Sequence, residues 1–561
     1  MNGKKNPILD ISHLSVNFDM DDGHVEAVKN VDITINEGEI VGLVGESGSG
    51  KTVTAQSILR LLPRPPAKFV SGQILFDEKD LMTLPIAELR KIRGSAISMI
   101  FQEPMTALSP LHKVGYQLVE ALQLHRQIDF QEAWQLSEDW LARTEIPNPK
   151  ERMYSYPHEL SGGMRQRIMI AMALMLEPRL IIADEPTTAL DVTVQAQIFR
   201  LLMRMKSKNT AVLLITHDMA VIWEMCDRVY VMKDGRIVES GWLEDIFNKP
   251  QKDYTKALLK AVPRLYKKGE TLTTSPERQP HDARLYSGTG DNLIEVDHLK
   301  VWFPVKRGLF AKTTSYVKAV DDVVLNIGPG ESVGLVGESG SGKTTLGRTI
   351  IGLQESHDGA IRFRGTLINN LKRRQMFKFR RHMQMIFQDP YSSLNPRMTV
   401  IDILTEGLIE HGLLRNHKKD KVAQLLEEVG MNPDMMNRYP FEFSGGQRQR
   451  ISVARALSLE PDFIVCDEAV SALDVSIQAQ IIQLLIDLQK KYNIAYLFIS
   501  HDLSVVRQIS NRIAVMYNGC IVEQGLADDV VLTPRHEYTQ RLLEAVPVPG
   551  DVDRRHLMRN P

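Results

Sequence analysis

The chain has 561 residues, too many for one ordinary core, since a single domain usually takes about 100–200 residues. Hydrophobic residues make up 43% of it and charged residues 24%, which is typical of a soluble globular protein. Lys and Arg (68) balance Asp and Glu (69), so bulk charge argues against a nucleic-acid-binding protein. The three cysteines lie far apart, which excludes a disulfide framework and a CxxC metal site.

We expect no segment of the chain to cross a membrane. The most apolar helical run, Ile168–Leu176, has nine residues and is followed by Glu177 and Pro178, whereas a spanning helix needs about 20 residues. The N-terminal residues MNGKKNPILD carry two lysines with no apolar stretch behind them, so we expect no secretory signal. Any function at a membrane would therefore depend on partner chains.

The first half of the sequence alternates predicted strands and helices. Ile40–Val44 is a short apolar run that ends at a glycine, and a helix is expected to begin near Lys51. Residues 106–157 have helical periodicity and no strong strand, which predicts a helical insert. Leu180–Ala183 and Ala211–Thr216 are continuous apolar runs of strand length, as expected for buried parallel strands. The order indicates an α/β fold.

The second half of the chain repeats the first. The string VGLVGESGSGKT occupies Val41–Thr52 and returns without change at Val333–Thr344. Because such a repeat marks duplicated structural units, we expect two tandem copies of about 260 residues each. Later strings that recur in the same order are SGGMRQR at Ser161 and SGGQRQR at Ser444, ADEPTTALDV at Ala183 and CDEAVSALDV at Cys466, and ITHD at Ile215 and ISHD at Ile499.

The repeat divides the chain into four expected segments. The two copies span residues 1–265 and 293–549. Residues 266–292 are polar, rich in Gly, Pro, Ser and Thr, and without helical or strand period. They are predicted to form a flexible linker rather than a surface loop within one domain. Residues 550–561 form a tail that we expect to be frayed.

A phosphate-binding loop follows the first buried strand of each copy. The pattern G-x-x-x-x-G-K-[ST] is met at Gly45–Thr52 and again at Gly337–Thr344. Its glycines let backbone N–H groups converge on phosphate oxygens at a helix N-terminus, and its lysine reaches the β- and γ-phosphates. Two identical matches argue against chance. The predicted nucleotide-binding residues are Gly45, Ser47, Gly48, Ser49, Gly50, Lys51, Thr52 and Val53, and Gly337, Ser339, Gly340, Ser341, Gly342, Lys343, Thr344 and Thr345.

An acidic pair closes a later strand in each copy. Asp184 and Asp467 end the runs LIIAD and FIVCD, where a carboxylate can hold Mg²⁺ directly or through water. Glu185 and Glu468 follow at once, and a carboxylate there can orient or deprotonate the water that attacks a γ-phosphate. In isolation each Glu would be an ordinary solvated residue at a strand end. Its place after a phosphate loop favours the catalytic role.

In this order the motifs resemble the nucleotide-binding domain of ABC ATPases, and the order holds twice over nearly the whole chain. The resemblance implies ATP and Mg²⁺ as cofactors. It implies an α/β fold of two tandem P-loop NTPase domains, each with a RecA-like core, an antiparallel β subdomain and a helical subdomain. It also implies that the Ser-Gly-Gly signature of one copy contacts the γ-phosphate of ATP held by the other. The signature residues are Ser161, Gly162, Gly163, Ser444, Gly445 and Gly446.

The resemblance assigns further roles to matched residues in the two copies. A histidine after a strand is by itself more often a core residue, but here its place in the series matches the switch histidine that binds the γ-phosphate. The implied catalytic residues are Glu185, His217, Glu468 and His501. The glutamine of FQEP and FQDP is implied to sense both the metal and the γ-phosphate. The implied metal-binding residues are Thr52, Gln102, Asp184, Thr344, Gln388 and Asp467.

Two remaining pairs of residues match more peripheral positions. Asp191 and Asp474 resemble the D-loop of the family. Phe18 and Phe303 match an aromatic residue that stacks on adenine, although either ring could instead be ordinary strand packing, and Trp302 competes with Phe303.

A finer resemblance is to the dipeptide, oligopeptide and nickel branch of ABC importers. It is carried by GESGSGKT, by EPMTALSP and DPYSSLNP, and by an end element with Pro250, Tyr254 and Thr255 that recurs with identical spacing from Pro534. By its residues alone the end element is a short packing helix. Many members carry a cysteine-rich segment beyond it, which this chain lacks, so no iron–sulfur cluster is implied. Among fused members of the branch, the chain resembles the ATPases for glutathione import and for uptake of a peptide antibiotic, and the strings EAVSALDVSI and AYLFISHD favour the first.

The resemblance implies an ATPase that energises peptide import through closure of its two domains. Its implied partners are two transmembrane permease subunits and an extracytoplasmic solute-binding protein, with no nucleic acid. Its implied location is the cytoplasmic face of the inner membrane, as a peripheral subunit. Three alternatives remain: a ribosome-associated ATPase of the ABC-F type, a sugar importer with fused domains, and an importer of nickel or another metal chelate.

Overall fold

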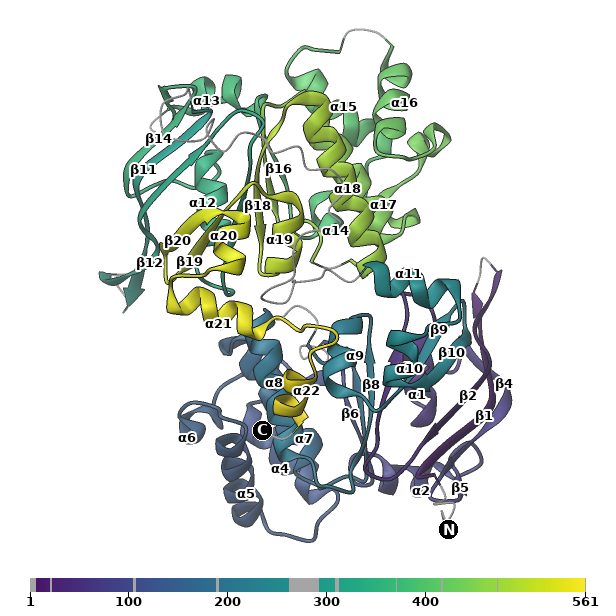
Figure 1. Cartoon of the computed structure of the whole chain (residues 1–561). Helices are drawn as coiled ribbons and strands as arrows, with labels where there is room; N and C mark the ends of the chain where they lie inside the picture. Colours follow the sequence, from purple (N-terminus) through teal and green to yellow (C-terminus); the bar gives the residue numbers. More distant parts are fainter. Residues whose placement is uncertain are drawn as a thin grey trace.

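The computed structural model consists of two copies of one α/β unit, each with a four-stranded and a six-stranded sheet. In Figure 1 the second copy lies above the first, and both chain ends lie in the lower half. The expected fold class and the tandem duplication are confirmed. The residues that the structure describes are 7–20, 23–103, 107–187, 191–261, 292–307, 312–369, 371–414, 417–471 and 473–559.

The strands of the first copy form two sheets. The four-stranded sheet is antiparallel, in the order β2-β1-β4-β5, and the six-stranded sheet runs β10-β9-β3-β8-β7-β6. The latter is parallel except for β10. The strands are β1 (Leu9–Met20), β2 (Gly23–Ile35), β3 (Ile40–Val44), β4 (Ala67–Phe76), β5 (Lys79–Asp80), β6 (Ile97–Ile100), β7 (Leu180–Asp184), β8 (Ala211–Thr216), β9 (Arg228–Lys233) and β10 (Arg236–Trp242).

The helices of the first copy fall into a core set and an insert between β6 and β7, as predicted. The core helices are α1 (Lys51–Ile58), α2 (Ile86–Ile92), α8 (Val192–Met205), α9 (Met219–Met225), α10 (Leu243–Asn248) and α11 (Asp253–Ala261). The insert holds α4 (Val114–Gln123), α5 (Phe130–Arg143), α6 (Pro149–Arg152), the 3₁₀ turn η1 (Pro157–Glu159) and α7 (Gly162–Leu174).

The second copy repeats these sheets, in the orders β12-β11-β14-β15 and β16-β17-β18-β13-β19-β20. Its strands are β11 (Ile294–Arg307), β12 (Lys312–Ile327), β13 (Ser332–Val336), β14 (Asp358–Phe363), β15 (Thr366–Leu367), β16 (Met383–Ile386), β17 (Phe463–Asp467), β18 (Ala495–Ser500), β19 (Arg512–Tyr517) and β20 (Cys520–Leu526). Its helices are α12 (Lys343–Ile350), α13 (Arg373–Arg380), α14 (Pro390–Ser393), α15 (Val400–Glu410), α16 (Lys418–Glu428), η3 (Pro433–Asn437), η4 (Pro440–Glu442), α17 (Gly445–Leu457), α18 (Val475–Tyr492), α19 (Leu503–Ile509), α20 (Ala527–Leu532), α21 (Glu537–Ala545) and α22 (Val552–Arg559).

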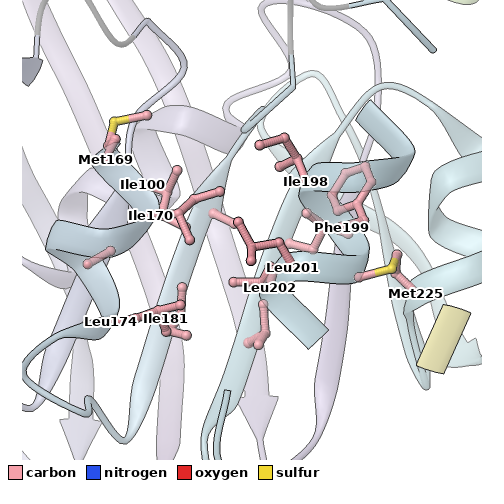
Figure 2. Close-up of a cluster of buried hydrophobic side chains, with 14 of the residues drawn as sticks. Ile100, Met169, Ile170, Leu174, Ile181, Ile198, Phe199, Leu201, Leu202 and Met225 are labelled. Carbon is pink, nitrogen blue, oxygen red and sulfur yellow. The ribbon is translucent and has the colours of Figure 1, made fainter. Parts of the chain in front are cut away.

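The inner strands of each six-stranded sheet are buried on both faces. In the first copy one face packs with the four-stranded sheet and α1, and the other packs under α7, α8 and α9. Figure 2 shows the second layer, where Ile100 and Ile181 of the strands meet Ile170 and Leu202 of the helices. A parallel strand covered on both faces contains apolar residues at every position, which explains the continuous apolar runs in the sequence.

The structure contradicts one expectation, a frayed C-terminal tail. Residues 552–559 form α22, which lies against α8 and α9 of the first copy (Figure 1). Met558 is 1% exposed within the first copy's core, and Arg559 pairs with Asp227 at 2.7 Å. Arg554 pairs with Glu224. The tail is ordered because its apolar residue and its guanidinium groups find partners far away in the sequence, 330 residues for Arg554 with Glu224, which its own sequence does not reveal.

Two other expectations concern the linker and the membrane. Residues 266–291 of the expected linker lie outside the described residues. Within the described ranges, no helix has the length and apolar character that a membrane crossing needs.

Candidate functional site

The phosphate-binding loop of each copy connects the central strand of the six-stranded sheet to a helix, β3 to α1 and β13 to α12. Gly50 and Gly342 precede these helices with φ of 102° and 106°, a conformation that favours glycine. A Cβ on Gly50 would also lie 2.4 Å from the carbonyl oxygen of Ala27, so no other residue fits there. The loop therefore keeps the shape that the sequence predicted.

The lysine of each loop is folded back over the loop itself. Lys51 Nζ donates to the carbonyl oxygens of Gly45 and Glu46, both at 2.8 Å. Lys343 makes the same two contacts at 2.8 and 2.7 Å. Burial lowers the pKa of both lysines, against the opposing effect of nearby carboxylates. A phosphate anion at this position would favour the charged form of each lysine.

The threonine after the lysine meets the aspartate that closes the neighbouring strand. Thr52 Oγ1 donates to Asp184 Oδ1 at 3.1 Å, and Thr344 Oγ1 donates to Asp467 Oδ1 at 2.7 Å. Burial raises the pKa of Asp184 to about 6 and raises the pKa of Asp467, although the threonine hydroxyls oppose the shift. A buried carboxylate beside a hydroxyl is an oxygen donor set that fits Mg²⁺, which usually takes one or two carboxylates, water and phosphate.

The next acidic residue is the centre of a small network in each copy. Gln102 Nε2 donates to Glu185 Oε2 at 3.0 Å, and His217 Nδ1 lies 3.3 Å from Glu185 Oε1. Glu185 adopts φ of 44°, an unusual value for a residue with a side chain. Strain of this kind is concentrated at functional sites, where the surrounding fold enforces it.

The same network recurs in the second copy. Gln388 Nε2 donates to Glu468 Oε2 at 2.8 Å, His501 Nδ1 lies 3.6 Å from Glu468 Oε1, and Glu468 has φ of 47°. Burial lowers the pKa of His501, but the hydrogen bond and charge of Glu468 outweigh it and leave the pKa raised. Burial raises the pKa of Glu468, but the hydrogen bond and charge of His501 outweigh it and leave the pKa lowered. The carboxylate is thus held ionised, as a proton acceptor requires.

A cavity of about 520 Å³ lies at the second phosphate loop. It is large enough for a nucleotide-sized ligand. The loop, the glutamine, the glutamate and the histidine that the sequence predicted all contribute to its lining, and every lining residue belongs to the second copy. Among the lining residues are Gly340, Lys343, Thr344, Gln388, Glu468 and His501.

The D-loop aspartates cross from one copy to the other. The backbone N–H of Ser47 donates to Asp474 Oδ1 at 2.8 Å, and that of Ser339 donates to Asp191 Oδ2 at 3.1 Å. Each phosphate loop is therefore in contact with the opposite copy.

Beside each of these contacts lies a second one that the sequence analysis missed. Ser476 Oγ donates to Glu46 Oε1 at 2.6 Å, and Thr193 Oγ1 donates to Glu338 Oε1 at 2.8 Å. The available signal was the hydroxyl two residues after the aspartate in both LDVT and LDVS, together with the unchanged Glu of GESGSGKT. The partners lie on different copies, so the pattern within one copy does not pair them.

The Ser-Gly-Gly signatures begin helices, as predicted. Ser161 caps α7 by accepting from the backbone N–H of Met164 at 3.3 Å, and Ser444 caps α17 by accepting from that of Gln447 at 3.4 Å. A Cβ on Gly446 would lie 2.6 Å from the side chain of Ile477, so this glycine lets α17 approach α18. That Ser161 and Ser444 bind ATP held by the opposite copy stays a prediction.

The two aromatic candidates occupy equivalent strand positions. Phe18 pairs with Val25 on β2, and Phe303 pairs with Val317 on β12. Phe18 packs against the apolar core of its copy, whereas Phe303 is 38% exposed. Trp302, the competing residue, stacks on His357 with ring centroids 4.6 Å apart. Stacking of either phenylalanine on adenine stays a prediction.

Comparison with known proteins agrees with this geometry. The family model "ABC transporter" matches residues 28–188 and 320–471, and the model "Oligopeptide/dipeptide transporter, C-terminal region" matches residues 238–289 and 522–560. The chain is 49% identical over 542 residues to the peptidoglycan transport ATP-binding protein YejF of Agrobacterium fabrum, with 96% of each chain covered. It is 47% identical over 558 residues to the glutathione import ATP-binding protein GsiA of Escherichia coli O157:H7, with 96% of this chain and 90% of that protein covered.

Proposed function

This chain belongs to the ABC transporter family of ATP-binding proteins, in the oligopeptide/dipeptide branch, and on this premise we propose that it hydrolyses ATP to drive an importer of peptides. Peptidoglycan and glutathione, which the names of its relatives give, are both peptide-containing molecules. We therefore propose a small peptide or peptide conjugate as cargo.

The observation that carries the proposal is the pair of matching sites in one chain. Each has a phosphate loop, a buried aspartate and a glutamate held between a glutamine and a histidine. Each loop is also in contact with the opposite copy through Asp191 or Asp474. Sites built at the junction of two copies couple nucleotide binding to the relative position of the copies.

The residues divide the chemistry between them. Lys51 and the loop N–H groups would bind the phosphates, and Thr52 and Asp184 would hold Mg²⁺, which when bound offsets the negative charge that develops on the phosphates. Glu185 would orient the attacking water and take its proton, with His217 and Gln102 fixing the carboxylate. The matched residues of the second copy would act in the same way.

We propose that the chain acts with permease subunits at the cytoplasmic face of the membrane, and that an extracytoplasmic binding protein delivers the cargo. One relative is a peptidoglycan transport ATP-binding protein and the other a glutathione import ATP-binding protein, which supports such partners. Selection of the cargo would then lie in those other chains.

Co-purification tests this proposal. The chain is expressed with a tag in its own cells, and detergent-solubilised membranes are captured on the tag. We expect permease subunits in the captured material and ATPase activity that rises when binding protein and peptide are added in proteoliposomes. Sedimentation of the chain with ribosomes, with no permease captured, would instead support the ABC-F type of ATPase.

A further inference from the structure

The end helix of each copy reaches the phosphate loop through one tyrosine. Tyr254 lies in α11 and Tyr538 in α21, the element that marks the peptide-importer branch. The backbone N–H of Glu46 donates to Tyr254 Oη at 3.1 Å, and that of Glu338 donates to Tyr538 Oη at 2.9 Å. We propose that these tyrosines are positioning residues that hold the phosphate loops from helices packed on the opposite copy.

The residue that each tyrosine holds is fixed at three points. The N–H of Glu46 is taken by Tyr254, its carbonyl oxygen by Lys51 at 2.8 Å, and its carboxylate by Ser476 of the opposite copy at 2.6 Å. In the second copy Glu338 is held in the same way. Because the loop binds phosphate through its backbone, a residue clamped on both peptide groups sets the direction of the N–H groups that follow it.

The helices that carry the tyrosines lie at the junction of the copies. Helix α11 of the first copy packs against α18 of the second, and α21 of the second packs against α8 of the first (Figure 1). Helices α8 and α18 are the ones that begin at the D-loops. The helix of each tyrosine therefore connects its own phosphate loop to the D-loop helix of the opposite copy.

The tyrosine hydroxyls are suited to this role. Burial raises the pKa of Tyr254 to about 12 and raises that of Tyr538, so both stay neutral and their oxygens remain good acceptors for an N–H group. Both rings are packed against a neighbour: Lys233 Nζ lies over the Tyr254 ring, 4.8 Å from its centroid, and the centroids of Tyr538 and Tyr517 are 4.2 Å apart. The hydroxyls have little freedom to turn away.

Removing the hydroxyls while keeping the rings tests the proposal, which rests on the proposed ATPase function. In the full chain with Tyr254→Phe and Tyr538→Phe we expect KM for ATP to rise about fivefold, the effect of one lost hydrogen bond per loop, with kcat within twofold of the wild type. We expect KM to change and kcat to stay because the loop holds phosphate equally in the ground and transition states. A purely structural role would lower the melting temperature and leave KM unchanged.

Tyr230→Phe is the matched control. Its hydroxyl also accepts a backbone N–H at 3.1 Å, that of Thr34, but in the four-stranded sheet interface away from the phosphate loop. We expect KM for ATP to stay at the wild-type value in this variant. A KM in the Tyr254→Phe and Tyr538→Phe protein equal to that of Tyr230→Phe would overturn the proposal, whereas a wild-type chain without ATPase activity would overturn the proposed function.

A double-mutant cycle tests the connection to the opposite copy. Tyr254→Phe and Ser476→Ala both act on Glu46, so their effects on KM should depart at least twofold from the product of the single effects. Tyr254→Phe and Thr193→Ala act on different loops and provide the control cycle. An equal departure in the two cycles would overturn the cross-copy connection.

Discussion

The two copies are alike in their sites and unlike in their ends. Both phosphate loops, both acidic pairs and both D-loop contacts recur with distances that differ by a few tenths of an ångström. The C-terminal helix α22, however, extends from the second copy and packs on the first. In the first copy the chain after α11 enters residues that the structure does not describe. The predicted site residues are thus present twice, whereas the contact of α22 runs only from the second copy to the first among the described residues.

The largest effect is expected when both copies lose the glutamate that the sequence predicts to be catalytic. In the full chain with Glu185→Gln and Glu468→Gln we expect kcat to fall about 10²- to 10⁴-fold, because no carboxylate remains to take the proton of water. ATP binding should persist, since the phosphate loops are unchanged. Steady-state ATPase assays and equilibrium binding of labelled ATP measure the two quantities. Unchanged turnover would show that these carboxylates are not the proton acceptors.

The next prediction uses the asymmetric helix. Met558→Ala removes a side chain that is 1% exposed, at an expected cost of at least about 2 kcal/mol in the docking of α22. Amide hydrogen exchange over residues 552–559 should therefore speed up about 30-fold. Leu557→Ala is the control, because Leu557 is 72% exposed on the same helix and should change exchange little. Equal rates of amide exchange in the two variants would mean that α22 is not docked in solution.

The third prediction compares the two sites one at a time. Because their contacts match, Glu185→Gln and Glu468→Gln alone should each lower kcat at least twofold and by the same factor. Assays of both single variants at saturating ATP measure this. A large loss in one variant and none in the other would show that the copies divide the work unequally in spite of their common geometry.

The smallest effect concerns the signature helices. Gln447 Oε1 accepts the backbone N–H of Ser444 at 3.1 Å and completes a capping box, which Met164 in the first copy cannot do. Met164→Gln should therefore stabilise the start of α7 by about 0.5–1 kcal/mol. Slower hydrogen exchange in the first turn of α7, at the level of α17, would support this. Gln447→Met should do the reverse.

Within each copy the sequence predicted the buried strands, the phosphate loop and the acidic pair, but not the contact of Tyr254 with that loop. The apolar runs before Gly45 and Asp184 fixed two buried strands, and glycine spacing fixed the loop between strand and helix. Other missed contacts join residues on different copies, such as Ser476 with Glu46. Their side chains are ordinary at their own positions, and only the assembled chain brings them together. The prediction of a frayed tail was wrong for the same reason. Met558 is one apolar residue in a polar segment, and the surface that buries it belongs to the first copy.

The docking of α22 changes how the two copies can separate. They are joined by the covalent linker and, at the other end of the second copy, by Arg554 and Met558 on the first. Two attachment points would raise the effective concentration of one copy beside the other and limit how far the copies can part. The nucleotide sites would then open while the contact of α22 with the first copy is kept. Each new ATP would therefore bind to phosphate loops that still lie close to the opposite copy.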